Sequence, residues 1–261
     1  MPRTDEISLD PTPSILIVGD SGSHKTHFLG TLPSPFIFDF DKGLSILRGV
    51  AGVEYATFKD APYKSKSFNP EIGIYEYGKA YPAFLEKLNE VGAPIKTKST
   101  GKADVEKPNP YKAIGLDSMT MLANCCMNYV RKEAGVGDAA PTLPQYNSQI
   151  SLLRTLMDQL TSWDILKIVT AHIQRDNNKV METTEMLPLV TGRLAGELAI
   201  YFDEVYYTKT EGKGPQRKFT FITESEGLIK QAKTRYGVPT GSLVDWKAIA
   251  PYITGEKTQY A

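Results

Sequence analysis

Residues 15–29 read ILIVGDSGSHKTHFL and carry the strongest signal of the fold in the chain. Its first four residues form an unbroken apolar run, which is the pattern of a β-strand buried on both faces. Small and polar residues follow, and Thr26-His27-Phe28-Leu29 can begin a helix. The strand, the tight turn and the helix together predict one unit of an α/β fold.

The turn between this strand and this helix has the spacing of a phosphate-binding loop. Residues 19–26 read GDSGSHKT, which fits the P-loop pattern G-x-x-x-x-G-K-[ST] at all positions but one. In such a loop, backbone N–H groups at a helix N-terminus bind phosphate, the lysine reaches the β- and γ-phosphates, and the hydroxyl residue ligates Mg²⁺. We therefore expect an ATP and Mg²⁺ site formed by Gly19, Asp20, Ser21, Gly22, Ser23, His24, Lys25, Thr26 and His27.

One position departs from the pattern. His24 stands where the last glycine is expected, and glycine normally supplies the positive φ that the bend requires. Histidine adopts positive φ more readily than most residues, but at an energetic cost. Replacing His24 by glycine should tighten nucleotide binding if the histidine is a tolerated strain, which we favour, and weaken it if the imidazole contacts phosphate. Two alternatives stay open: an ordinary strand–turn–helix, and a P-loop with weakened affinity.

Carboxylates at the ends of two further predicted strands suit the same site. Asp117 follows an apolar run, where a Walker B carboxylate would hold Mg²⁺ opposite Thr26. An aspartate in this place is also a common helix cap. Asp41 follows a short buried strand and is our candidate for the carboxylate that orients the attacking water, with Asp39 as the alternate. Ordinary turn chemistry is the competing interpretation of that segment.

The rest of the chain alternates strands with helices. This order predicts an α/β fold with a mostly parallel central sheet flanked by helices, and a C-terminal β-hairpin at 204–209 and 219–223. Hydrophobic patterns place strands at 15–18, 36–38, 54–58, 113–116 and 165–170, and helices at 82–91, 118–134, 147–162 and 192–200.

We expect a single domain over residues 14–261, preceded by a flexible arm at 1–13. The lysine-rich segment 94–111 is interpreted as an inserted loop, either solvated or in contact with DNA. The polar segment 174–185 is predicted to be a second loop.

Composition excludes several classes of protein. The chain has 261 residues, 41% of them apolar and 23% charged, so it is long enough for a sizeable core and is not disordered throughout. Thirty Lys and Arg balance thirty Asp and Glu, which argues against a polybasic nucleic-acid binder. The two cysteines are adjacent and no apolar run could span a bilayer, so we expect a cytoplasmic protein without disulfides.

Together these motifs resemble the RecA-like P-loop ATPase core, in particular the short single-domain ATPases of bacteriophages associated with recombination and single-strand annealing. The resemblance runs from about Ser14 to Gly241. PFIFDFDKGL resembles the strand that ends in the family's catalytic carboxylate, here Asp41 rather than the usual glutamate. IVTAHIQRD resembles the strand whose terminal polar residue couples the γ-phosphate to a DNA-binding loop, which implies His172 as that sensor and Gln174 as its alternate.

A second resemblance lies near the end of the core. QAKTRYG, followed by a Thr-Gly pair, resembles the Lys-x-Arg-x-Gly element of DnaB-type ATPases. In that family the two cations reach the γ-phosphate of a neighbouring subunit. The resemblance therefore implies that Lys233 and Arg235 act catalytically across the interface of a homo-oligomer, either a filament or a ring.

The resemblance implies a Mg²⁺-dependent ATPase that binds single-stranded DNA and assists recombination, annealing or replication. It implies a phage-encoded protein of the host cytoplasm, with a single-strand-binding protein as a further partner. The alternatives are a P-loop motor or loader that acts on protein partners, and a non-hydrolysing nucleotide-binding scaffold. In the RecA architecture the DNA-facing loops would offer Arg131, Lys132, Arg175, Lys179 and Tyr146.

Overall fold

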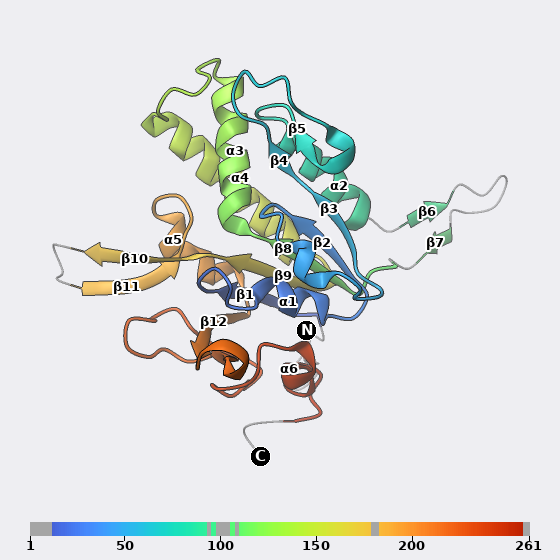
Figure 1. Ribbon diagram of the computed structural model, residues 1–261, viewed down its shortest axis with the longest axis vertical. Helices are drawn as coiled ribbons and strands as arrows, with labels where there is room; N and C mark the ends of the chain where they lie inside the picture. Colours follow the sequence, from blue (N-terminus) through green and yellow to red (C-terminus); the bar gives the residue numbers. More distant parts are fainter. Residues whose placement is uncertain (1–11, 93–94, 98–104, 108–109, 179–182, 258–261) are drawn as a thin grey trace, which may run out of the picture.

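The computed structural model describes residues 12–92, 95–97, 105–107, 110–178 and 183–257, and it is built around one central sheet (Figure 1). The sheet has seven strands in the order β13-β12-β1-β9-β8-β2-β3. All neighbouring pairs are parallel except β12 and β13, which form the expected antiparallel hairpin. The strands are β1 (Ser14–Val18), β2 (Pro35–Asp39), β3 (Glu54–Thr57), β8 (Ala113–Asp117), β9 (Leu166–Ala171), β12 (Glu204–Glu211) and β13 (Lys218–Ile222).

Alternate residues of the strands enter two separate hydrophobic cores, one on each face of the sheet. In β1, Leu16 and Val18 belong to the larger core, whereas Ile15 and Ile17 belong to the smaller one. This alternation follows from the two-residue period of a strand and explains why the central strands are apolar throughout. The expected α/β architecture, with a largely parallel sheet between layers of helices, is confirmed.

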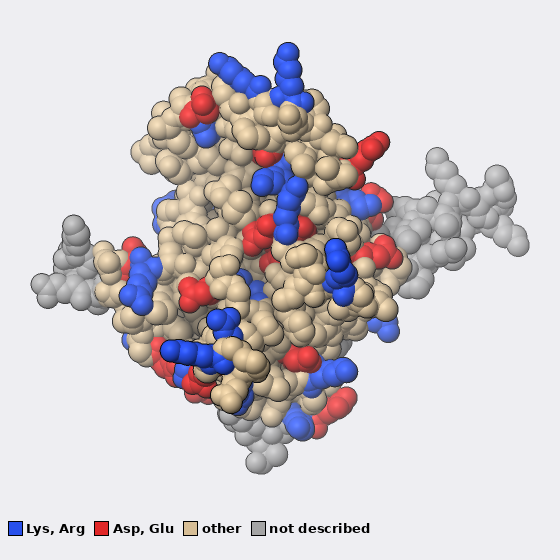
Figure 2. Space-filling model, in the orientation of Figure 1, with Lys and Arg blue, Asp and Glu red and all other residues tan. Residues whose placement is uncertain are grey.

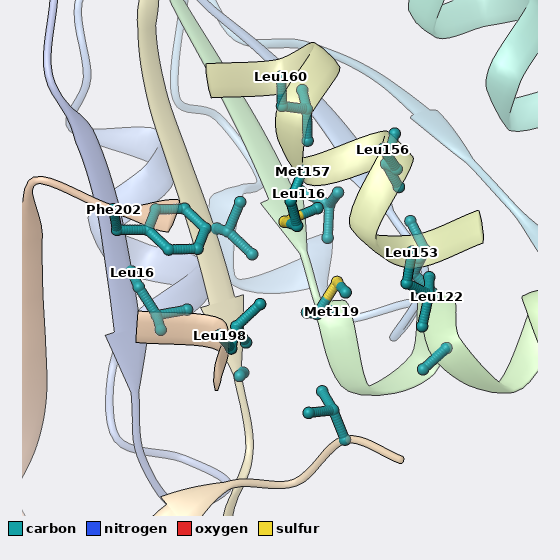
Figure 3. Close-up of a cluster of buried hydrophobic side chains, with 14 of the residues drawn as sticks. Leu16, Leu116, Met119, Leu122, Leu153, Leu156, Met157, Leu160, Leu198 and Phe202 are labelled. Atoms are coloured by element: carbon teal, nitrogen blue, oxygen red, sulfur yellow. The ribbon is translucent and has the colours of Figure 1, made fainter. Parts of the chain in front are cut away.

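The helices divide between these two faces. Those on the larger core are α2 (Ala80–Gly92), α3 (Met119–Glu133), α4 (Leu143–Thr161) and α5 (Leu194–Glu197), while α1 (Lys25–Gly30) and α6 (Trp246–Ile253) cover the other face. Figure 3 shows Leu122 of α3 beside Leu153 of α4, and Leu116 of β8 beside Met157 of α4. The structure also contains short 3-10 helices: η2 (Leu44–Leu47), η3 (Pro70–Ile72), η4 (Leu198–Tyr201) and η5 (Gly214–Gln216).

Two predictions about local structure are wrong. The segment predicted as a loop at 174–185 is an antiparallel ribbon, β10 (Ile173–Asn178) paired with β11 (Thr183–Pro188). Residues 175–177 of β10 are exposed and polar, so this strand lacks the apolar alternation by which a half-buried strand is recognised. Helix α4 begins four residues before the predicted start at 147, and the backbone N–H of Thr142 donates to Gln145 Oε1 at 2.7 Å. This Thr-x-x-Gln pair is a helix-start signal that the hydrophobic pattern alone does not contain.

The predicted arm and insertion fall mainly outside the described residues. Of the arm 1–13, only its last two residues are described, and they are held in place: Pro13 O accepts a hydrogen bond from Lys167 N at 3.2 Å. Within the insertion 94–111, β6 (Ile95–Thr97) pairs antiparallel with β7 (Val105–Lys107), so part of it is a hairpin rather than a loop. Two further short strands, β4 (Lys59–Asp60) and β5 (Ile74–Tyr75), pair with each other beside β3.

Charges are mixed over the surface. On the face shown in Figure 2, basic and acidic side chains are interspersed, as expected from a net charge of zero. No helix in the described parts of the chain has both the length and the apolar character needed to cross a bilayer.

Candidate functional site

The phosphate loop lies between the carboxyl end of β1 and the first turn of α1. Two of its residues have left-handed backbone, Gly22 at φ 75° and His24 at φ 67°. His24 therefore has the positive φ that the P-loop bend was expected to require of it. Gly19 is required for a different reason, because a Cβ atom there would lie 1.7 Å from Thr208 Oγ1 on β12. The loop can pack this closely against β12 only with glycine at that position.

Lys25 is held inside the loop. Its ammonium group donates to Gly19 O at 2.8 Å and to Asp20 O at 2.7 Å, and only 6% of the residue is exposed. Burial lowers the pKa of Lys25, and the nearby carboxylates of Asp117 and Asp41 act in the opposite direction. A buried cation at the N-terminus of a helix is suited to binding a phosphate chain.

Thr26 and Asp117 meet as predicted. Thr26 Oγ1 donates to Asp117 Oδ2 at 2.6 Å, and Thr170 Oγ1 donates to Asp117 Oδ1 at 2.6 Å. Asp117 is 1% exposed, and burial raises its pKa despite the two hydroxyl donors. Thr170 was not selected from the sequence, because it reads there as an ordinary strand residue.

This pair fits a magnesium ion bound together with phosphate. No group of three His, Cys, Asp or Glu side chains that could hold a metal occurs among the described residues. Mg²⁺ usually keeps several waters and is bound through one or two carboxylates and the substrate's phosphates, so a hydroxyl and one carboxylate are a sufficient protein contribution. The donor set of Thr26 and Asp117 meets that requirement.

Asp41 and His172 also lie together, although 131 positions separate them in the chain. Asp41 Oδ2 and His172 Nε2 are 2.9 Å apart, and Ser118 Oγ donates to Asp41 Oδ1 at 2.9 Å. His172 follows β9 directly, and Asp41 lies just beyond β2. The carboxyl ends of these parallel strands share one edge of the sheet, which explains the meeting. Gln174, the alternate to His172, instead donates to Pro188 O within the β10–β11 ribbon.

A cavity of about 580 Å³ joins these groups. The predicted residues 21–27 line it, together with Asp41, Asp117 and His172, while Gly19 and Asp20 lie behind Lys25. Its size is within the usual range of small-molecule sites, about 300–1,000 Å³. The cavity is also lined by residues that were not selected from the sequence: Gly43, Ile46, Met121, Arg217 and Phe219. The last two belong to the hairpin of β12 and β13, and only the sheet order brings them beside the P-loop.

Asp39, the alternate to Asp41, does not line this cavity. It lines a separate one of about 520 Å³, and its carboxylate accepts hydrogen bonds from Thr57 Oγ1 at 3.1 Å and Gly43 N at 3.4 Å. Burial is the main reason that the pKa of Asp39 is raised to about 6. The geometry therefore favours Asp41 as the carboxylate beside the phosphate loop.

The raised pKa of Asp39 gives a pH-dependent prediction. As pH rises from about 4 to 6, the unfolded chain loses this proton before the folded chain does, so the residue makes folding less favourable. Asp39→Asn keeps an acceptor oxygen but never ionises. The free energy of unfolding of this variant minus that of wild type should be about 2 kcal/mol larger at pH 7.5 than at pH 4.5. Denaturant titrations at both pH values measure this, with exposed Asp138→Asn as the control; an equal gain at both pH values would contradict the prediction.

The imidazole of His24 is stacked on the hairpin. Its ring centroid lies 3.5 Å from that of Phe219 with 14° between the planes, and 5.0 Å from that of His27 with 28° between them. Burial and, secondarily, His27 lower the pKa of His24. His24, whose backbone is strained, thus makes stabilising aromatic contacts with both Phe219 and His27.

Two variants of His24 separate the backbone strain from the stacking. His24→Gly and His24→Ala both remove the ring, but only glycine adopts φ 67° freely. We expect the glycine variant to be more stable to unfolding than the alanine variant by about 1 kcal/mol. It should also bind inorganic tripolyphosphate more tightly, because the bent loop is more populated. Equal stability and affinity of the two variants would mean that the positive φ carries no cost.

Lys233 and Arg235 lie far from the P-loop of their own chain. The backbone of Lys233 pairs with that of Val205, and Arg235 Nη1 donates to Asp203 Oδ1 at 2.7 Å. Both contacts are at the amino end of β12, whereas the P-loop follows the carboxyl end of β1, its parallel neighbour. The structure therefore does not bring these two cations to the nucleotide cavity within one chain.

Comparison with known proteins gives one family match. The family model described as AAA domain matches residues 12–236, which include every strand of the central sheet and the whole phosphate loop. No curated protein matches the chain. Among solved structures, the chain is similar to a KaiC-like protein from the hyperthermophilic archaeon Pyrococcus horikoshii OT3. That similarity has a TM-score of 0.40 and 10% identity, covering 80% of this chain and 77% of the other.

Proposed function

The chain belongs to the AAA domain family, and from this premise we propose that it is a Mg²⁺-dependent ATPase that binds single-stranded DNA and assists recombination, annealing or replication. We propose further that it is phage-encoded and acts as a homo-oligomer, with a single-strand-binding protein as a partner. The observation that carries the nucleotide part is the 2.6 Å hydrogen bond between Thr26 and Asp117 beside a buried Lys25.

The site residues divide into those that bind the nucleotide and those that act on the attacking water. Lys25 and the loop 21–24 hold the phosphate chain, and Thr26 and Asp117 hold Mg²⁺, which supplies charge neutralisation when bound. Asp41, oriented by Ser118 and His172, positions the water that attacks the γ-phosphate. Positioning of the reactants and electrostatic stabilisation together account for most of the catalysis in phosphoryl transfer.

The β10–β11 ribbon supports the DNA part of the proposal. His172 directly precedes β10. Its carbonyl oxygen accepts a hydrogen bond at 2.7 Å from the backbone N–H of Leu189, which directly follows β11. Both ends of the ribbon are therefore connected to His172, which lines the cavity. Arg175 on β10 is exposed and has no ion pair with the described residues, so it can contact a phosphate backbone, whereas Lys132 forms an ion pair with Glu76 at 3.4 Å. Tyr146 on α4 is 39% exposed and offers a ring on which a base can stack.

Steady-state ATP hydrolysis, with and without single-stranded DNA, tests this function. We expect DNA to raise the rate of hydrolysis. We expect Arg175→Ala to weaken DNA binding and to lower, by about 0.7 for one lost phosphate contact, the slope of the logarithm of the binding constant against the logarithm of the salt concentration. Lys247→Ala on α6 is the control, because that exposed lysine lies on the opposite face of the sheet. Hydrolysis unaffected by DNA would indicate a motor or loader acting on protein, and binding without turnover would indicate a scaffold.

A further inference from the structure

The order of the strands determines which end of the cavity receives the γ-phosphate. Asp117, His172 and Asp41 follow β8, β9 and β2, which all lie on one side of β1 in the sheet. The hairpin of β12 and β13 lies on the other side of β1. If a triphosphate on the P-loop directs its γ-phosphate toward Asp117, as the proposed function requires, its nucleoside must extend toward the hairpin.

The hairpin end of the cavity has an aromatic wall, which we define as the rings of Phe219, His24 and His27. The three rings form a continuous stack, with His24 in the middle, and all three residues line the cavity. A nucleobase is flat and has a π-face, so aromatic side chains bind it with little dependence on its identity. Among the described residues that line the cavity, the one further aromatic ring is that of His172, at the γ-phosphate end.

A cationic side chain beside this wall is available to a ligand. Arg217 lines the cavity two positions before Phe219 and is exposed, and the described residues give its guanidinium no acidic partner within 4.0 Å.

We propose that the aromatic wall and Arg217 form the binding site for the nucleobase of the nucleoside triphosphate. The base stacks against the wall, and the guanidinium of Arg217 covers or hydrogen-bonds the base edge. His24, the departure from the P-loop pattern, then has a role, because its ring fills the space between Phe219 and His27 and connects the hairpin to the loop.

Binding of ATP is compared with binding of inorganic tripolyphosphate, which has the phosphates but no base. Phe219→Leu keeps apolar packing and removes the aromatic face, and Arg217→Ala changes an exposed side chain that the fold does not need. Each variant should weaken ATP binding about tenfold while changing the Kd of tripolyphosphate by less than about twofold. Phe68→Ala, which alters an exposed ring outside the cavity, and Lys218→Ala, beside Arg217, are the matched controls and should leave both affinities unchanged.

The outcomes distinguish a failure of the nucleobase site from a failure of the whole nucleotide site. If wild type binds neither ATP nor tripolyphosphate, the nucleotide site itself is wrong. If wild type binds both and the two variants lose affinity equally for both, Phe219 and Arg217 act on the phosphates or on the fold, and the nucleobase site is overturned. Thermal unfolding of Phe219→Leu identifies a folding defect, and Arg217→Ala then decides the question alone.

Discussion

Lys25→Ala is expected to abolish ATP hydrolysis while leaving a folded protein. The ammonium group is the only side-chain cation buried in the phosphate loop among the described residues, and it lies beside the Thr26–Asp117 pair. Without it the phosphate loop supplies no buried side-chain cation to the negative charge on the β- and γ-phosphates. The turnover rate should fall at least about a hundredfold, the usual cost of removing one preorganised group that stabilises the transition state. Phosphate release and the melting temperature are measured on the same preparation.

Lys167→Ala is the matched control for that experiment. Lys167 is a second buried lysine, 4% exposed, and its ammonium group donates to Trp163 O at 2.6 Å, outside the nucleotide cavity. It should lower stability without a comparable loss of turnover by the molecules that remain folded. Wild-type turnover in Lys25→Ala would contradict the phosphate-loop assignment, whatever the stability of the two variants.

Arg235→Ala is expected to bind ATP normally and to hydrolyse it poorly. The side chain is 65% exposed and its guanidinium forms a surface ion pair with Asp203, so its loss costs little stability. The buried Glu204 carboxylate accepts the backbone N–H groups of both Arg235 and Tyr236, which fixes the turn that presents this arginine. An arginine finger is worth about 10³ to 10⁵ in rate. Since Arg235 is remote from its own P-loop, the loss should appear only if it serves a neighbouring subunit.

Mixing variants tests the action across subunits. Inactive Arg235→Ala and inactive Lys25→Ala chains should regain activity together, because some hybrid interfaces combine an intact loop with an intact arginine. Arg193→Ala is the control, since Arg193 is also an exposed arginine in a surface ion pair, with Glu197 at 3.6 Å. Mixed oligomers without any recovered activity, at every ratio of the two variants, would show that Arg235 supplies no finger.

The sequence predicted those parts of the fold in which local pattern and tertiary structure agree. The buried run before Gly19 and the Lys-Thr pair after the loop specify β1 and α1 without help from the rest of the chain. Asp41, Asp117 and His172 could be placed together because parallel strands end at one edge of a sheet. The site was predictable to the extent that it is built from strand ends.

Other parts of the site depend on contacts between distant segments. The stacking of His24 on Phe219 joins residues 195 positions apart, and nothing in the alternating pattern of β13 indicates that Phe219 lines the cavity. The preference for Asp41 over Asp39 likewise needed the tertiary structure for support, because the two carboxylates are two positions apart in the sequence but line different cavities. The exposed β10–β11 ribbon was missed because its strands stabilise each other mainly through backbone pairing.

The most direct test of the central claim is ATP turnover by the wild-type chain with Mg²⁺ and with EDTA in its place, each with and without single-stranded DNA. The nucleotide site formed by Lys25, Thr26 and Asp117 predicts phosphate release that requires Mg²⁺, and the proposed coupling through His172 predicts that DNA accelerates it. Absence of phosphate release under every condition, by a chain that is folded and binds ATP, would contradict the assignment of this protein as an ATPase.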